Sequence, residues 1–196
     1  MKVYDQIEQG TEEWLNLRLG KFTASKAQTI QANGSGLDTL CLVKVIEILT
    51  GTREQNYVSA DMERGNELEP SARNLYEIQT GNIVNQVGFI ELDEWIGCSP
   101  DGLVGEDGMT EFKCPSDIVF LKYMLSKKIN MGYYWQMQMQ MWVANRKWND
   151  YGVYNESFKN RLIVRRVKRN DRDIAKIKLG IKTGIRGVKQ ILKKVR

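Results

Sequence analysis

The 196-residue chain contains no histidine. This absence excludes catalytic triads and general bases built on histidine, and it removes the usual zinc and copper ligand sets. A bound metal would therefore have to be held by oxygen atoms. Oxygen ligands favour hard cations such as magnesium, manganese or calcium, so the missing residue narrows the metal chemistry that is available.

Cysteine is scarce as well. The chain holds Cys41, Cys98 and Cys114, which form no Cys-x-x-Cys pair and leave one cysteine over. This pattern argues against a disulfide framework or a zinc site, and three cysteines cannot supply the four ligands of an iron–sulfur cluster. We therefore expect free thiols in a reducing compartment.

Long apolar runs and a secretory signal are also missing. No apolar run approaches the roughly 18 residues that a membrane helix needs, and the opening MKVYDQIEQG lacks a basic region followed by an apolar one. We expect the protein to remain in the cytoplasm, that of the host if the chain is viral. Its length fits one domain over 1–196, with a helical part over about 1–80, a sheet and helix over about 81–168, and a basic helix over about 170–196.

Charge is divided unevenly along the chain. Residues 159–196 hold 15 Lys or Arg against two Asp, a local charge of +13, and the whole chain carries +5, which leaves −8 for residues 1–158. A basic end on an acidic chain commonly marks a surface for a polyanion, and nucleic acid is the first candidate. The alternative is a solvated surface helix without a partner.

The first third of the chain carries several helix signals. Thr11, followed by two glutamates, predicts the start of a helix that ends near Gly20. Ser25 and Gln28 have the spacing of a capping box and predict a second helix start. Two further helices are predicted over 37–50 and over 62–76, the latter extending toward Thr80.

After Gly81 the pattern changes to short β-rich runs separated by Gly, Asn and Asp, which predicts antiparallel strands. A helical stretch then covers 120–144 with a break around 130–132, followed by strands near 151–154 and 162–167. Isoleucines spaced by three or four, surrounded by lysine and arginine, predict an amphipathic helix over the basic end. This order of elements predicts an α+β or mixed α/β domain.

The stretch CSPDGLVGEDGMTEFKCP, residues 98–115, reads as a short hairpin with charged residues. Side chains alternate faces along a strand, so Glu111 and Lys113 point the same way, and pairing across the turn can bring Asp101 near Glu111. Two close carboxylates repel, so the arrangement calls for a cation, supplied by the lysine or by a hard divalent ion. The alternative is a surface hairpin with a weak cross-strand ion pair.

Two other segments favour a functional site. In the helix that contains ERGNELEPSARNLYE, Glu69 borders the apolar face and can look inward. In YYWQMQMQMWV, helical spacing places Gln138 beside Trp135 and Trp142, where an amide without a hydrogen-bonding partner would be costly. Read as a strand instead, the same segment would place its three glutamines on one polar face.

The order of these motifs resembles the PD-(D/E)XK nucleases, and more narrowly the YqaJ and lambda-exonuclease type of viral recombination nuclease. EQGTEEWLNLRLGKFTAS is similar to that family's opening motif, CSPDGL and EFKCP to its central motifs, and QMQMQMW to its third. The resemblance covers roughly residues 8 to 145. It implies a restriction-endonuclease-like core, with a central mixed sheet flanked by helices.

The resemblance also implies a set of functional residues. Mg²⁺, for which Mn²⁺ can substitute, would be held by Asp101, Glu111 and the carbonyl of Phe112, with Glu69 completing or water-bridging the set. Lys113 would help to position or deprotonate the attacking water. Because a lysine of ordinary pKa, about 10.4, is a poor base, we favour positioning and charge stabilisation for it.

Three more residues match family positions with a stated role. Gln138 would orient the attacking water, and Arg18 and Ser25 would receive the 5′ phosphate of a DNA end. A guanidinium suits phosphate because it forks onto two oxygens, and free amides at a helix start add an anion site. Ser25 as a plain helix cap is the alternative, and the two roles can coexist.

The activity implied is a magnesium-dependent deoxyribonuclease. It would degrade duplex DNA from 5′ ends and leave a 3′ single strand for an annealing protein in phage-type recombination. One alternative is an endonuclease of the same fold that nicks or cuts internally, and another is a non-catalytic DNA-binding protein that uses the basic end. Processive nucleases of this group can form toroidal trimers, so a homo-oligomer is a further expectation.

Overall fold

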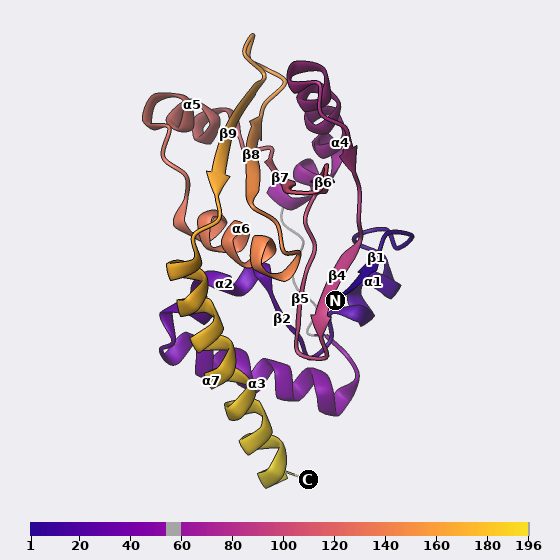
Figure 1. Cartoon of the computed structure of the whole chain (residues 1–196), viewed down its shortest axis with the longest axis vertical. Helices are drawn as coiled ribbons and strands as arrows, with labels where there is room; N and C mark the ends of the chain where they lie inside the picture. The colour runs from indigo at the N-terminus through magenta and orange to yellow at the C-terminus, as the bar shows by residue number, and fades with distance from the viewer. Residues whose placement is uncertain (54–59, 196) are drawn as a thin grey trace.

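The computed structural model of the chain describes residues 1–53 and 60–195 and contains two mixed β-sheets flanked by helices (Figure 1). The expected mixed α+β architecture is therefore confirmed, with two sheets in place of one central sheet. All three cysteines are free and buried, as expected from their spacing. Among the described helices, none is long and apolar enough to cross a membrane.

The smaller sheet has four strands in the order β1-β4-β5-β2, and the larger has five in the order β3-β6-β7-β8-β9. In the small sheet β5 and β2 run parallel, and in the large sheet β7 and β8 do. The strands of the small sheet are β1 (Lys2–Tyr4), β2 (Phe22–Thr23), β4 (Phe89–Asp93) and β5 (Ile96–Cys98). Those of the large sheet are β3 (Val84–Asn85), β6 (Gly102–Val104), β7 (Gly108–Lys113), β8 (Trp148–Tyr154) and β9 (Leu162–Lys168). The expectation of antiparallel strands after Gly81 is confirmed for the pairs β3–β6, β4–β5 and β6–β7. Strand β8 follows the helical crossover and pairs parallel to β7.

The helices follow the sequence signals closely. Thr11 caps the first helix, since its Oγ1 accepts a 3.3 Å hydrogen bond from the amide of Trp14. The expected break in the helical stretch over 120–144 is present but begins earlier, because Lys127 adopts a left-handed conformation and Asn130 caps the next helix. The helices are α1 (Glu12–Leu17), α2 (Ala27–Ala32), α3 (Ser35–Thr50), α4 (Ala60–Thr80), α5 (Asp117–Ser126), α6 (Met131–Val143) and α7 (Asp171–Val195), with a short 3₁₀ helix η1 (Ala24–Lys26).

The capping box predicted at Ser25 is wrong. Ser25 lies inside η1, its exposed hydroxyl is 3.3 Å from that of Thr23, and α2 begins after Lys26, whose side chain does not cap it. The reason is packing. Ala24 and Ala27 are both buried, and residues three apart lie on the same side of a 3₁₀ turn, so this tighter turn buries both.

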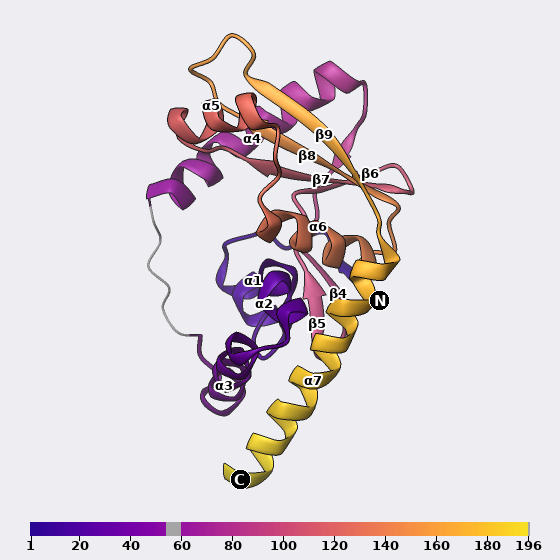
Figure 2. The ribbon, with the colours of Figure 1, turned by 90° about the vertical axis from the view of Figure 1, so that its left-hand side faces the viewer.

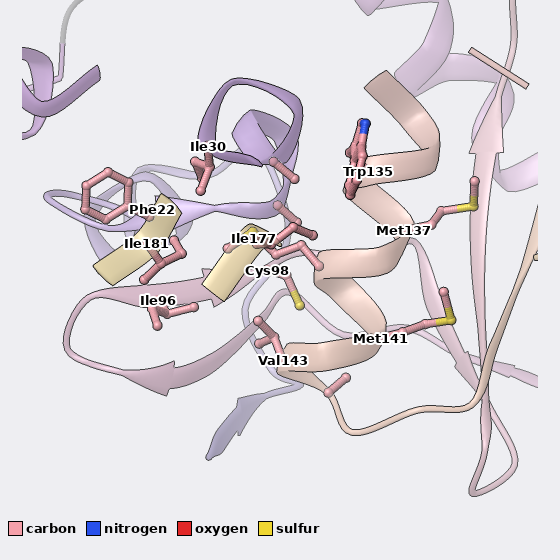
Figure 3. Packing of buried hydrophobic residues seen from close by; sticks show 14 of the residues in the cluster. Phe22, Ile30, Ile96, Cys98, Trp135, Met137, Met141, Val143, Ile177 and Ile181 are labelled. Carbon is pink, nitrogen blue, oxygen red and sulfur yellow. The ribbon is translucent and has the colours of Figure 1, made fainter. Parts of the chain in front are cut away.

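Helix α7 is part of the core as well as of the surface. Its isoleucines Ile177 and Ile181 are buried among Ile30 of α2, Ile96 of β5 and other apolar side chains (Figure 3). At Gly180 an added Cβ would lie 1.9 Å from the carbonyl oxygen of Ile30, so the glycine permits close contact with α2. The basic residues of α7 lie on its exposed side.

Helix α6 lies between the two sheets. Figure 2 shows it below strands β7 to β9 and above α1, α2, β4 and β5. Helix α4 packs on the other side, against β7, β8 and β9. The side chains of β7 therefore face α6 or α4 according to their alternation along the strand, and this arrangement builds the site described next.

Candidate active site

Strand β7 supplies a carboxylate and an ammonium on one face. Glu111 is fully buried, and Lys113 donates a 2.5 Å hydrogen bond from Nζ to its Oε1. The residue between them, Phe112, points to the opposite layer, where its ring meets Tyr76 of α4 with centroids 5.7 Å apart. The alternation expected from sequence is confirmed, and the burial of Glu111 excludes an exposed surface ion pair.

Asp101 joins this face across the β6–β7 hairpin. Gly102 pairs with Thr110, so Asp101 stands beside the next residues of β7 and its Oδ2 accepts a 2.5 Å hydrogen bond from the amide of Phe112. Burial raises the pKa of Asp101 well above its usual range, and the nearby charges of Glu111 and Glu69 raise it further. The hairpin therefore holds two carboxylates close together in a buried place.

Glu69 approaches the same site from α4. Burial raises its pKa, the charge of Glu111 adds to this rise, and Arg73 opposes it from 3.5 Å. The site thus sets Asp101 and Glu111 close together, with Glu69 at its border and with Lys113 as the ammonium that contacts Glu111 directly. After burial, the charges of Glu111 and Glu69 are the next causes of the raised pKa of Asp101, so the three carboxyl groups influence one another electrostatically.

Lys113 remains charged in this setting. Burial alone would lower the pKa of its ammonium, but Glu111 and Asp101 together raise that pKa above its ordinary value. Its Nζ also lies 5.0 Å from the centre of the Tyr133 ring, on the face where a cation is favoured. A lysine held in the ammonium form suits positioning and charge stabilisation and does not suit proton abstraction.

Two glutamines of α6 fix the orientation of Glu111. Gln136 and Gln140 each donate a 2.6 Å hydrogen bond from Nε2, the first to Oε1 and the second to Oε2 of that carboxylate. They are four residues apart and so lie on one side of the helix. The amide oxygen of Gln140 is in turn held by Asn149 of β8 at 3.0 Å.

The placement predicted for Gln138 is wrong. Its Nε2 donates to the carbonyl of Lys168 at 3.0 Å and its Oε1 accepts from the amide of Asn170 at 2.8 Å, so it holds the connection between β9 and α7. Two residues along a helix turn about 200°, which directs Gln138 away from the side that Gln136 and Gln140 share. The four-residue spacing of those two glutamines was the sequence signal that could have identified them.

The donor atoms at this site fit a hard cation. Asp101, Glu111 and the carbonyl of Phe112 offer oxygen atoms only, which are the ligands that a hard dication such as Mg²⁺ prefers. Within residues 1–53 and 60–195, no three His, Cys, Asp or Glu side chains come together as a complete metal-binding cluster. Glu69 is directed toward Arg73, so the compact part of the set consists of Asp101 and Glu111.

A second group of polar residues surrounds Arg18. Its Nη1 donates to Ser99 Oγ at 3.0 Å, and its guanidinium lies 4.1 Å from the centre of the Trp14 ring. Trp14 Nε1 donates to the same Ser99 oxygen at 2.9 Å. Burial, together with the charge of Arg53, lowers the pKa of Arg18 to about 10, and its buried Nε has no hydrogen-bond partner among the described residues.

Ser25 leaves the small sheet at the same end as the residues that lead to Asp101. Strands β2 and β5 are parallel, with Thr23 opposite Gly97, so the residues that follow the two strands lie at the same end of the sheet. Ser25 follows β2, and Ser99 and Asp101 follow β5. Ser99 was missed by sequence reasoning, although it lies within the CSPDGL motif, because no local pattern relates it to Arg18.

The chain matches a known family over most of its length. The model of the YqaJ-like viral recombinase domain matches residues 13–147, a range that includes the hairpin carboxylates and the α6 glutamines. The chain belongs to the YqaJ-like viral recombinase domain family. The resemblance stated from the sequence motifs is confirmed. No curated protein matches the chain.

Solved structures agree with this assignment. The alkaline exonuclease LHK-Exo from Laribacter hongkongensis has 35% sequence identity and a TM-score of 0.88, over 94% of this chain and 96% of that one. LHK-Exo in complex with dAMP matches with 34% identity and the same coverage and TM-score. A phage-related exonuclease from Haemophilus somnus 129PT shares the fold, with a TM-score of 0.76 and 18% identity over 90% of this chain and 96% of that one. The fold is of the PD-(D/E)XK type, and family and structure place the protein among the nucleases.

Proposed function

We propose that the protein is a magnesium-dependent exonuclease that hydrolyses duplex DNA from 5′ ends and leaves 3′ single strands for an annealing protein. The observation that carries the proposal is the convergence of Asp101, Glu111 and Lys113 beside one buried hairpin. The exonuclease relatives support hydrolysis from an end. The direction of digestion from 5′ ends, the use of Mg²⁺ and the role in recombination are all parts of this proposal.

The chain's own oxygens would hold the metal. Asp101, Glu111 and the Phe112 carbonyl would bind Mg²⁺ or Mn²⁺, and Glu69 would act from the outer side, through a water molecule. When bound, a divalent ion lowers the pKa of water and stabilises charge on the phosphate. Gln136 and Gln140 keep the Glu111 carboxylate in one orientation, so a ligand set would not need to reorganise before each turnover.

Lys113 would act on the reacting groups directly. Its ammonium lies at the edge of the carboxylate cluster, where it can hydrogen-bond an attacking water and a non-bridging phosphate oxygen. The scissile phosphate carries negative charge into a place already rich in carboxylates. A permanent positive charge there lowers the repulsion and stabilises the charge that develops during hydrolysis.

Recognition of the DNA end would fall to Arg18 and Ser25, with Ser99 beside them. Arg18 is held by neutral partners, so its charge remains available to a phosphate. A relative solved in complex with dAMP supports a nucleotide monophosphate as a ligand of this fold. The exposed basic side of α7 would add sequence-independent contacts to DNA phosphates, and a homo-oligomer would keep the enzyme on its substrate.

Linear and covalently closed circular DNA distinguish the proposal from its alternatives. We expect linear duplex to be digested in the presence of Mg²⁺, with a 5′ end label released before a 3′ end label, and closed circles to survive. Efficient cutting of closed circles would replace the proposal with an endonuclease. DNA binding without any hydrolysis, in Mg²⁺ or Mn²⁺, would replace it with a non-catalytic DNA-binding protein.

A further inference from the structure

A buried ion pair lies beneath the turn that follows Arg18. Glu47 Oε2 accepts a 2.9 Å hydrogen bond from the amide of Gly20 and a 2.8 Å hydrogen bond from Lys44 Nζ. Both charged residues belong to α3 and are buried, with 7% exposure for Lys44 and 4% for Glu47. Gly20 has a φ of +71°, and a Cβ there would lie 2.8 Å from Ile48, so the turn rests closely on α3.

The contacts of Arg18 do not include Glu47. Arg18 contacts the Ser99 hydroxyl and the Trp14 ring, both neutral, and no described residue pairs with its Nε. Glu47 acts on Arg18 through space and so raises its pKa, although burial and Arg53 outweigh that effect. The carboxylate that could neutralise Arg18 is bonded to Lys44 and to Gly20 instead.

We propose that Lys44 is a positioning residue for the end-phosphate site. By pairing with Glu47, it keeps that carboxylate away from Arg18 and leaves the guanidinium available to the 5′ phosphate of a DNA end. The inference rests on the proposed function and deepens it. It states that recognition of the phosphate by Arg18 depends on the ion pair between two residues of α3. Lys44 itself contacts neither the phosphate nor the reacting atoms.

The charge balance explains why the pair is needed. Arg18, Lys44 and Arg53 set three positive charges against Glu47 in this region, an excess that attracts a phosphate dianion. Without the Lys44 charge, Glu47 would be a buried carboxylate lacking its counter-ion, which is costly. Arg18 would then be drawn from Ser99 to Glu47, and the guanidinium would be neutralised before a phosphate arrives.

A charge-removal series tests the inference. kcat and KM are measured for duplexes that carry a 5′ phosphate or a 5′ hydroxyl, with wild type, Lys44→Met and the double variant Lys44→Met/Glu47→Gln. We expect Lys44→Met to lower kcat/KM for the phosphorylated duplex about tenfold, in proportion to one lost charge-assisted hydrogen bond, and to change the hydroxyl duplex far less. The double variant removes both charges and should recover the wild-type preference within about threefold.

A matched control removes another buried carboxylate that is ion-paired elsewhere. Asp150 of β8 is bonded to Arg166 and Tyr76, and Asp150→Asn should leave the ratio of phosphate to hydroxyl rates unchanged. Lys44→Gln provides a second neutral variant in case Lys44→Met does not fold. Both Lys44 variants and the double variant are checked by thermal melting.

Two outcomes would overturn the inference. Either the Lys44 variants keep the wild-type preference for phosphate, or the double variant loses that preference as severely as the single ones, which would indicate a purely structural role. A failure of the proposed function has a different signature: wild-type enzyme would cleave both duplexes equally or neither of them. Recovery in the double variant is a result that loss of packing alone would not produce.

Discussion

Gln140 donates a 2.6 Å hydrogen bond from Nε2 to Oε2 of Glu111, which connects helix α6 to strand β7. The same amide nitrogen lies 3.4 Å from the carbonyl of Ser99, the residue that contacts Arg18. One side chain therefore links the carboxylate of the candidate active site to the backbone that supports the proposed end-phosphate site. Helix α6 therefore supports both the candidate active site and the proposed end-phosphate site.

The two kinds of glutamine on α6 should respond differently to substitution. Gln140→Ala releases one oxygen of Glu111 and should reduce kcat about 10- to 100-fold; because it also leaves buried Glu111 and Asn149 without a partner, it should cost about 1–3 kcal/mol of unfolding free energy as well. Gln138→Ala leaves the Lys168 carbonyl and the Asn170 amide without partners and should cost about 1–3 kcal/mol of unfolding free energy. Denaturant unfolding and single-turnover cleavage of both variants separate the effects. A greater loss of kcat in Gln138→Ala would place Gln138 in the catalytic machinery instead.

Glu111 and Lys113 should be essential for hydrolysis and dispensable for binding. We expect Glu111→Gln or Lys113→Ala to reduce cleavage of linear duplex by at least about 100-fold, because each removes a charge that stabilises the reacting phosphate. DNA affinity, measured by fluorescence anisotropy at fixed salt, should persist. Full residual cleavage in both purified variants would remove the catalytic assignment.

Divalent metal should stabilise the protein through Asp101. Mg²⁺ or Mn²⁺ binds the folded state and should raise the melting temperature of wild type, and chelation should abolish cleavage. Asp101→Asn relieves repulsion with Glu111 and Glu69, so without metal it should melt at or above the wild-type temperature and gain nothing from Mg²⁺. Glu106→Gln, in the exposed β6–β7 turn, serves as the control. An equal Mg²⁺ shift in Asp101→Asn would rule out this ligand set.

The exposed side of α7 should govern the salt dependence of DNA binding. Deleting the helix would remove buried core residues, so point substitutions are the better test. Lys182→Gln/Lys193→Gln in the inactive Glu111→Gln protein should flatten the slope of log K against log salt by up to about two units, as two lost phosphate contacts require. Lys147→Gln/Lys159→Gln, also at exposed positions, provides the matched control. Equal slopes in both pairs would leave α7 as a solvated surface helix.

The ion pair between Lys21 and Glu91 of the small sheet should contribute to acid stability. A hydrogen bond from Lys21 lowers the pKa of Glu91, burial opposes this, and Tyr4 adds to the lowering. A carboxylate with a lowered pKa in the folded state stabilises it above the ordinary value of 4.5, and that contribution disappears as the pH falls through the lowered pKa. Glu91→Gln should therefore reduce stability at pH 7 and flatten its decline below about pH 4.5. Thermal melts from pH 7 to pH 3 check this, and an unchanged acid decline would contradict it.

Local sequence patterns predicted those features whose residues lie close to one another along the chain. The two-residue period of a strand placed Glu111 and Lys113 on one face, and the hairpin turn brought Asp101 to them. Helical periods located α3, α4 and α7, because burying an apolar stripe requires a regular repeat. The order of the motifs along the chain was specific enough to indicate the family by itself.

Other features depend on contacts between distant segments. Sequence alone did not show that Gln136 and Gln140, and not Gln138, face Glu111, since a helix period says which residues share a side but not which side meets the sheet. The 3₁₀ turn at Ser25 and the Lys44–Glu47 pair beneath Arg18 likewise depend on how α2 and α3 pack. The sequence by itself determined the elements and the chemistry of the carboxylate cluster, because both arise from local periodicity. Only the tertiary structure decided which amides and charges surround this cluster. An isolated helix does not show which of its sides will be buried against the sheet, and long-range packing decides this.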